Sequence, residues 1–246
     1  GRVFMQRVKN PVLNRLDNQE VIDRSYSSTY LGVSVKTGIL LLVTILSGVG
    51  AWWLLHNNQN ALIAILAVSG ITAFISVMIA SFFPRVAMPF SILYSAAQGF
   101  TLGLITIIAD SFYPGIGLTA VTITIVIFGV MLALYSSRTI RATSRFRKIM
   151  FTALISILIF SILSIFIPGI NNLFVNNFGL AVGMSLLLIL FGAFMLILNF
   201  DQAEMVVSHG APKNYEWSVA LGLMVTIIWI YVEVLRLLII FFMNRD

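Results

Sequence analysis

Seven long apolar runs restrict what this sequence can fold into. Each run is close to the roughly 20 residues that an α-helix needs to cross the hydrocarbon core of a bilayer. Strands of a membrane β-barrel would be about ten residues long with strict alternation, and the runs lack that pattern. The sequence therefore predicts an all-α integral membrane protein with seven transmembrane helices, at residues 35–55, 61–82, 88–109, 118–135, 149–167, 179–200 and 217–243.

The composition agrees with lipid as the main solvent. Hydrophobic residues make up 59% of the chain and charged residues only 10%, against about a quarter charged in ordinary globular domains. The connectors are too short to hold a folded soluble domain. We therefore expect two parts, a polar N-terminal segment at residues 1–34 and a transmembrane domain at residues 35–246.

Lysine and arginine occupy alternate connectors. They lie in the N-terminal segment and after the second, fourth and sixth runs, while the other connectors hold none. Because cytoplasmic loops are enriched in these residues, the N-terminus is predicted to be cytoplasmic. The densest group, at residues 138–148, signals orientation and also suits anionic lipid headgroups. It lacks the interleaved aromatic residues of an RNA-binding surface, so no nucleic-acid partner is expected.

The sequence argues against several kinds of functional site. The chain has no cysteine and only two histidines, so a zinc site is not predicted. No Gly-rich segment followed by Lys-Ser or Lys-Thr is present, which argues against an ATP-driven pump. Both histidines lie in connectors, which argues against a serine hydrolase inside the membrane. The sequence predicts neither an enzyme nor a bound cofactor.

An amide, Gln98, lies in the third run, and an acid, Asp110, lies at its end. Gln98 precedes Gly99, and Gly103 follows four residues later. Small residues at this spacing let two helices approach closely, so we predict packing at the glycines and a hydrogen bond from Gln98 across the interface. Asp110 ends the run shortly before Pro114 and is predicted to be a cap or a solvated acid.

The richest polar stretch runs from the sixth apolar run to the end of the seventh. Asp201 and Glu204 are three residues apart and therefore share a helix face. Glu216 begins the last run, where an acid suits the helix dipole. Glu233 lies deep in that run, where an unpaired carboxylate is very unfavourable. Two interpretations remain open for Glu233: an ion pair with Arg236, or a titratable gate facing the bundle interior.

At these residues the chain resembles the Bax inhibitor-1 family, in its bacterial branch. The resemblance covers nearly the whole chain and is strongest in the last third. The matching segments include Asn199-Phe200-Asp201 with Glu204, Gly210-Ala211-Pro212-Lys213 with Glu216-Trp217, Trp229-Ile230-Tyr231-Val232-Glu233 with Leu235-Arg236, Asn10-Pro11-Val12-Leu13 and Tyr113-Pro114-Gly115-Ile116.

The resemblance implies a last helix surrounded by the other six and a pH-sensitive calcium leak in the bacterial plasma membrane. It implies that Asp201 and Glu233 form a paired-carboxylate proton sensor, able to hold calcium transiently, with Arg85 as the basic residue that holds Asp201. Such a pair would titrate as a unit. Glu204, Arg236 and Gln98 are the candidate supporting residues.

The chain departs from the family pattern at two positions. The second acid is more often Asp than Glu, and a Glu usually stands where this chain has Gln98. The expected partners are membrane lipid, calcium and protons. A second function from the same resemblance is a non-channel regulator that restrains a membrane-anchored protease.

Overall fold

The computed structural model describes residues 26–57 and 59–245, so most of the predicted N-terminal segment lies outside the described residues. Seven of its helices are long and apolar enough to cross a membrane. They are α2 (Tyr30–Asn57), α3 (Leu62–Phe82), α4 (Ala87–Phe112), α5 (Ile116–Ser136), α6 (Ser144–Phe166), α8 (Phe178–Ser208) and α9 (Asn214–Met243). The predicted all-α multi-pass membrane protein is confirmed, and each predicted span falls on one of these helices.

Three short helices join the long ones: η1 (Gln59–Ala61), η2 (Pro84–Val86) and α7 (Pro168–Asn176). The sequence indicated only a connector where α7 lies. Pro168 occupies the first turn of α7, where a missing N–H costs no helical hydrogen bond and the fixed φ favours the helix. Proline therefore starts a helix at this point.

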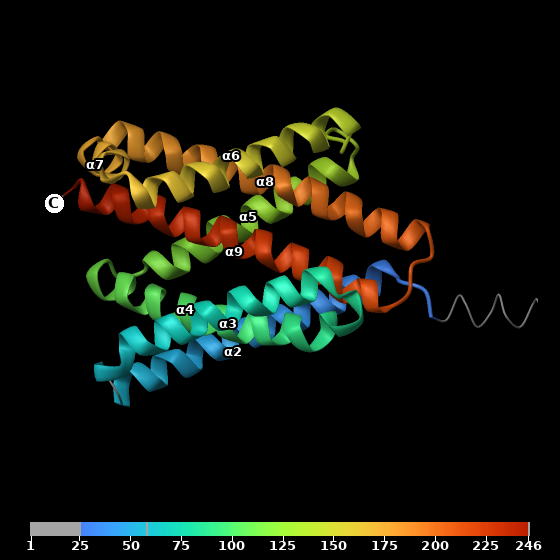
Figure 1. The fold of residues 1–246 in the computed structure, drawn as a ribbon, viewed down its shortest axis with the longest axis horizontal. Helices are drawn as coiled ribbons and strands as arrows, with labels where there is room; N and C mark the ends of the chain where they lie inside the picture. The colour runs from blue at the N-terminus through green and yellow to red at the C-terminus, as the bar shows by residue number, and fades with distance from the viewer. Residues whose placement is uncertain (1–25, 58, 246) are drawn as a thin grey trace, which may run out of the picture.

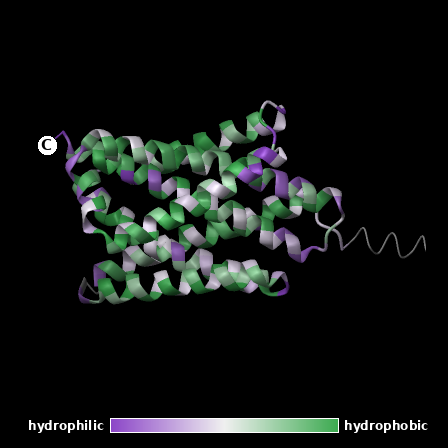
Figure 2. Cartoon of the chain, turned by 45° about the horizontal axis from the view of Figure 1, so that its top comes forward, coloured by the Kyte–Doolittle hydropathy of each residue, from purple (hydrophilic) through white to green (hydrophobic). Residues whose placement is uncertain are grey.

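The long helices run up and down between two ends of the bundle (Figure 1). One end, called here the basic end, holds the start of α2, the α5–α6 and α8–α9 connectors, and η2, and it includes Arg85, residues 138–148 and Lys213. The opposite end holds the α4–α5 turn, α7 and the C-terminus. Hydrophobic residues predominate along the helices between the two ends, and many of the most hydrophilic residues lie at the helix ends and connectors (Figure 2). The connectors that carry lysine and arginine therefore lie at the same end of the folded bundle. The cytoplasmic placement of this basic end stays a prediction.

The last helix is central for most of the bundle. α9 packs against α2, α3, α4, α5 and α8, and its buried side chains join both apolar cores. α6 differs, because it packs on α7 and α8 and Met150 is its one buried residue. The expectation that six helices surround the last one therefore fails at α6.

The glycine face of α4 packs as predicted. A Cβ added at Gly99 would lie 2.3 Å from the Thr44 carbonyl oxygen of α2, and one at Gly103 would lie 2.6 Å from the Cα of Gly48. α2 and α4 therefore meet backbone to backbone, which is how helices associate in lipid without a hydrophobic driving force.

The chain just before α2 is tied to the α8–α9 connector. Ser28 N donates to the Ala211 carbonyl over 2.7 Å, and Lys213 N donates to the Tyr26 carbonyl over 3.0 Å. Gly210 has a φ of +63°, the left-handed conformation that commonly ends a helix and that glycine adopts without steric strain. The Gly-Ala-Pro-Lys motif therefore ends α8 and presents its backbone to residues 26–28.

Candidate functional site

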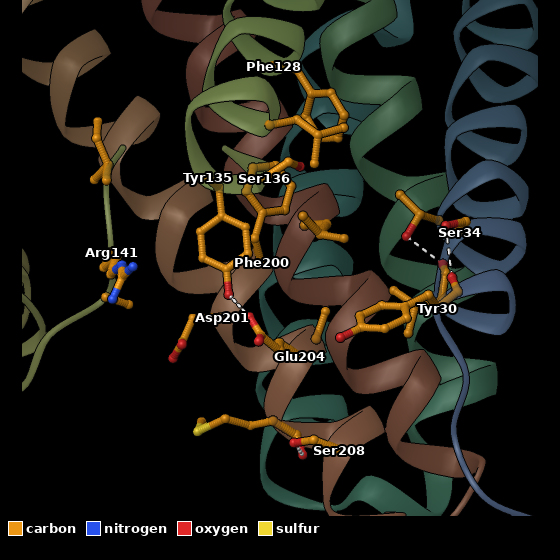
Figure 3. Close-up of a pocket in the computed structure, with 18 of the residues that line it drawn as sticks. Tyr30, Ser34, Phe128, Tyr135, Ser136, Arg141, Phe200, Asp201, Glu204 and Ser208 are labelled. Carbon is orange, nitrogen blue, oxygen red and sulfur yellow. Dashed lines mark hydrogen bonds between the residues drawn. The ribbon is translucent and has the colours of Figure 1, made fainter. Parts of the chain in front are cut away.

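A cavity of about 890 Å³ opens at the basic end, between α2, α5 and α8. Asp201 and Glu204 both line it, as their three-residue spacing predicts (Figure 3). Arg138 and Arg141 line it from the α5–α6 connector, and Tyr30 lines it from α2. The cavity therefore combines acidic, basic and aromatic side chains from three helices and one connector.

Asp201 accepts a hydrogen bond from Arg147 and forms an ion pair with it. Arg147 belongs to α6 and Asp201 to α8, so this pair joins the two helices near the basic end. The sequence indicated Arg85 as the basic partner, and that prediction is wrong in this structure. Arg85 is exposed in η2, between α3 and α4, whereas the α5–α6 connector brings Arg147 beside α8.

Glu204 accepts a hydrogen bond from the Tyr135 hydroxyl of α5. Tyr135 also stacks at a tilt on Phe200, with ring centroids 5.7 Å apart. Glu204 therefore ties α8 to the end of α5, and its supporting role at the site stays a prediction.

A second cavity, of about 1190 Å³, lies toward the opposite end between α6, α7, α8 and α9. Glu233 lines it and is only 5% exposed. Arg236 donates a hydrogen bond to Glu233 Oε1 and forms an ion pair with it. The second carboxylate oxygen, Oε2, is buried and has no hydrogen-bond partner within the part of the chain that the structure describes.

The structure shows the predicted ion pair of Glu233 with Arg236, and the interpretation of Glu233 as a titratable gate stays a prediction. Among the described residues that line this cavity, Glu233 and Arg236 are the charged ones, and the other polar groups are serine, asparagine and tryptophan side chains. The unpartnered oxygen still leaves capacity for a proton or a cation, because a carboxylate accepts several hydrogen bonds or metal contacts.

Asp201 and Glu233 do not meet. Leu223, which shares a cavity with Asp201, precedes Glu233 by ten residues of α9, roughly 15 Å at the rise of an α-helix. The register of α8 against the antiparallel helix α9 explains why Asp201 and Glu233 lie far apart. Asn199 Nδ2 donates to Thr226 Oγ1 over 2.5 Å, and Trp229 Nε1 donates to the Leu188 carbonyl over 3.0 Å.

The shared-proton pair is therefore a wrong prediction for this structure, and so is a calcium site made by both acids. Within the described ranges, no three His, Asp or Glu side chains cluster closely enough to hold a metal ion together. Asp201 instead pairs with Arg147, and Glu233 pairs with Arg236. The two acids line different cavities.

The other predicted polar residues have structural contacts. Asp110 Oδ1 accepts a hydrogen bond from Gly115 N over 3.0 Å and caps the α4–α5 turn. Gln98 is half-buried, and in the described chain its side chain makes no hydrogen bond to a neighbouring helix. The packing at the glycines is thus confirmed without the predicted bond from Gln98.

Sequence reasoning missed the partner of Glu216. This carboxylate is 1% exposed, and its Oε2 lies 2.8 Å from Lys36 Nζ of α2. Lys36 Nζ also lies 5.6 Å from the centre of the Trp217 ring. The sequence did contain a signal for this ion pair, because Lys36 and Glu216 lie at the starts of two apolar runs that begin at the same end of the bundle.

Arg138 has an unexpected backbone conformation, with a φ of +58°. Arg138 N donates to the Tyr135 carbonyl and Thr139 N to the Leu134 carbonyl. These two bonds are those of a Schellman motif, in which Gly or Asn usually occupies the left-handed position. The end of α5 therefore places an arginine where the backbone favours glycine.

The comparisons with known proteins give one match. The family model described as Bax inhibitor 1 like matches residues 10–243, nearly the whole chain. Neither a curated protein nor a solved structure matches the chain.

Proposed function

Because the chain belongs to the Bax inhibitor 1 like family, we propose that it is a pH-sensitive calcium leak of the bacterial plasma membrane, with Asp201 and Glu233 as its titrating groups. The observation that carries this proposal is Glu233 Oε2, a buried carboxylate oxygen without a hydrogen-bond partner in the described chain, beside a large cavity. An acid within a spanning helix marks an ion or proton pathway by default.

The two cavities suggest the ends of a pathway. The Asp201 cavity opens at the basic end and the Glu233 cavity toward the opposite end. Between them, Leu196, Ile197 and Ile230 are fully buried. This apolar layer would stop a hydrated ion, so the arrangement corresponds to a closed pathway.

Each acid would respond to protonation in its own way. Protonation of Asp201 removes the charge that holds Arg147, which loosens α6 from α8 and favours opening. Protonation of Glu233 removes the negative charge beside its cavity and leaves Arg236 uncompensated, which repels a cation. Flux should therefore rise as Asp201 takes up a proton and fall as Glu233 does.

The test is calcium flux into liposomes that hold the purified protein, measured across pH. Asp201→Asn mimics the protonated acid, so it should raise flux at neutral pH and flatten the rise on acidification. Arg147→Gln removes the same ion pair and should also raise flux. Glu233→Gln should lower flux at every pH.

Asp110→Asn is the matched control, because Asp110 is an acid at a helix end outside both cavities. Its pH profile should match that of the unmodified protein. An unchanged profile in both Asp201→Asn and Glu233→Gln contradicts the proposal. Absence of flux from the unmodified protein at any pH also contradicts it, and favours the regulator of a membrane-anchored protease.

A further inference from the structure

We propose that the cavity at the basic end binds one anionic phospholipid, with Arg138 and Arg141 holding the headgroup phosphate. This inference does not depend on ion flow. It concerns the cavity between α2, α5 and α8, and it assigns a role to two arginines that the proposed leak does not use.

The charges of the cavity favour an anion at its rim. Asp201 is paired with Arg147, and Glu204 accepts the Tyr135 hydroxyl. Arg138 and Arg141 line the cavity and are exposed, and neither forms an ion pair within the residues that the structure describes. The guanidinium groups therefore keep free donors in the geometry that matches phosphate oxygens.

The cavity wall deeper in the bundle is apolar. Val33 and Leu41 of α2 line one side, and Phe128 and Leu132 of α5 line the other. All four lie in helices long and apolar enough to span the membrane, and Leu132 is 41% exposed. A basic rim above an apolar wall matches the order of phosphate and acyl chain in a phospholipid, whereas a free phosphate would make no use of the wall.

Tyr30 and Ser34 come from α2 on the side of the cavity away from Arg141 (Figure 3). Their hydroxyl groups suit the glycerol and ester oxygens of a lipid. An anionic lipid would thus contact α2, α8 and the α5–α6 connector together.

The backbone of Arg138 supports the same conclusion. Its left-handed φ of +58° occupies the glycine position of the motif that ends α5. Glycine would relieve this conformation, so the arginine side chain has a use that outweighs the backbone preference. The phosphate of a lipid supplies that use.

The experiment titrates the full-length protein in neutral detergent with phosphatidylglycerol or with phosphatidylcholine of the same acyl chains. Native mass spectrometry counts bound lipid, and tryptophan fluorescence follows thermal unfolding. One phosphatidylglycerol should bind in preference to phosphatidylcholine and raise the melting temperature. Arg138→Gly and Arg141→Gln should each weaken this binding about tenfold, the usual effect of losing one charged hydrogen bond.

Arg138→Gly also separates binding from folding. Because glycine suits the backbone there, the variant should melt without lipid at or above the temperature of the unmodified protein, while losing the response to phosphatidylglycerol. Arg145→Gln is the charge-matched control, since Arg145 belongs to the same basic segment but does not line the cavity. It should keep the response.

Three outcomes overturn the proposal. Equal loss of binding in Arg145→Gln means that the lipid responds to diffuse positive charge. Equal stabilisation by inorganic phosphate means that the site takes a free anion. Unchanged lipid binding in both Arg138→Gly and Arg141→Gln means that the cavity is not the site.

Discussion

Glu216 is the most deeply buried acid in the described chain, and Lys36 compensates its charge over 2.8 Å. Thr29 N also donates to Glu216 Oε1, over 3.4 Å. A Cβ at Gly32 would lie 1.7 Å from Glu216 Oε2, so glycine is needed to admit the carboxylate. The contacts of Glu216 with Lys36 and Thr29 tie the start of α2 to the start of α9. They lie directly beside the contacts of residues 26–28 with the α8–α9 connector.

Glu216→Gln should destabilise the protein strongly. Removing one partner of a buried ion pair costs about 3–5 kcal/mol, and we expect the lower part of that range because the Lys36 side chain is 19% exposed. Thermal unfolding in detergent measures the effect.

The double variant Lys36→Met with Glu216→Gln tests the coupling of the two residues. It should be less destabilised than the sum of the two single variants, since neither charge is then left alone. Additive losses would show that the ion pair does not account for the effect of Glu216.

At the scale of whole helices, α4 and α6 differ in how they are held. α4 carries small residues at four-residue intervals, namely Ala87, Ser91, Ser95, Gly99 and Gly103, and α2 approaches the glycine part of this face. α6 buries only Met150 of its own residues and is joined to α8 by Arg147 and Asp201. α6 is therefore the long helix with the fewest buried side chains to oppose a displacement.

Gly99→Leu and Gly103→Leu should each destabilise the bundle by about 1–3 kcal/mol, the usual cost of overpacking. The physical reason is the backbone of α2, which cannot move aside as a flexible side chain can. Thermal unfolding in detergent measures the change.

Gly129→Ala of α5 is the matched control, because a Cβ there meets nothing within 4 Å. It should be neutral or stabilising, since alanine favours a helix over glycine by about 1 kcal/mol. Wild-type melting temperatures in both leucine variants would contradict the packing seen between α2 and α4.

For the molecule as a whole, the up-and-down order of the helices brings the arginine- and lysine-bearing connectors to one end. From the positive-inside rule we predict that this end lies in the cytoplasm. With seven spans, the opposite end of the bundle is then predicted to lie on the other side of the membrane.

Single cysteines test this orientation directly, because the chain contains no cysteine of its own. A membrane-impermeant thiol reagent applied to intact cells should label Asn57→Cys. It should label Arg141→Cys only after the membrane is opened. The reverse pattern would invert the predicted topology.

The spans, the charged end of the bundle and the glycine face of α4 could all be predicted from the sequence. Each depends on neighbouring residues, since a helix in lipid must satisfy its own backbone hydrogen bonds and small residues act at fixed helical spacing. The shared face of Asp201 and Glu204 and the cap made by Asp110 are local in the same way.

The partners of the acids depend on how distant helices align, and local pattern does not contain that information. Lys36 and Glu216 are 180 residues apart, and Arg147 and Asp201 are 54 apart. Asp201 and Glu233 match the family motif, yet the register of α8 against α9, held by Asn199 with Thr226 and by Trp229 with Leu188, separates them into two cavities. Side-chain packing along the whole length of the two helices sets that register, so it emerges only when the bundle assembles.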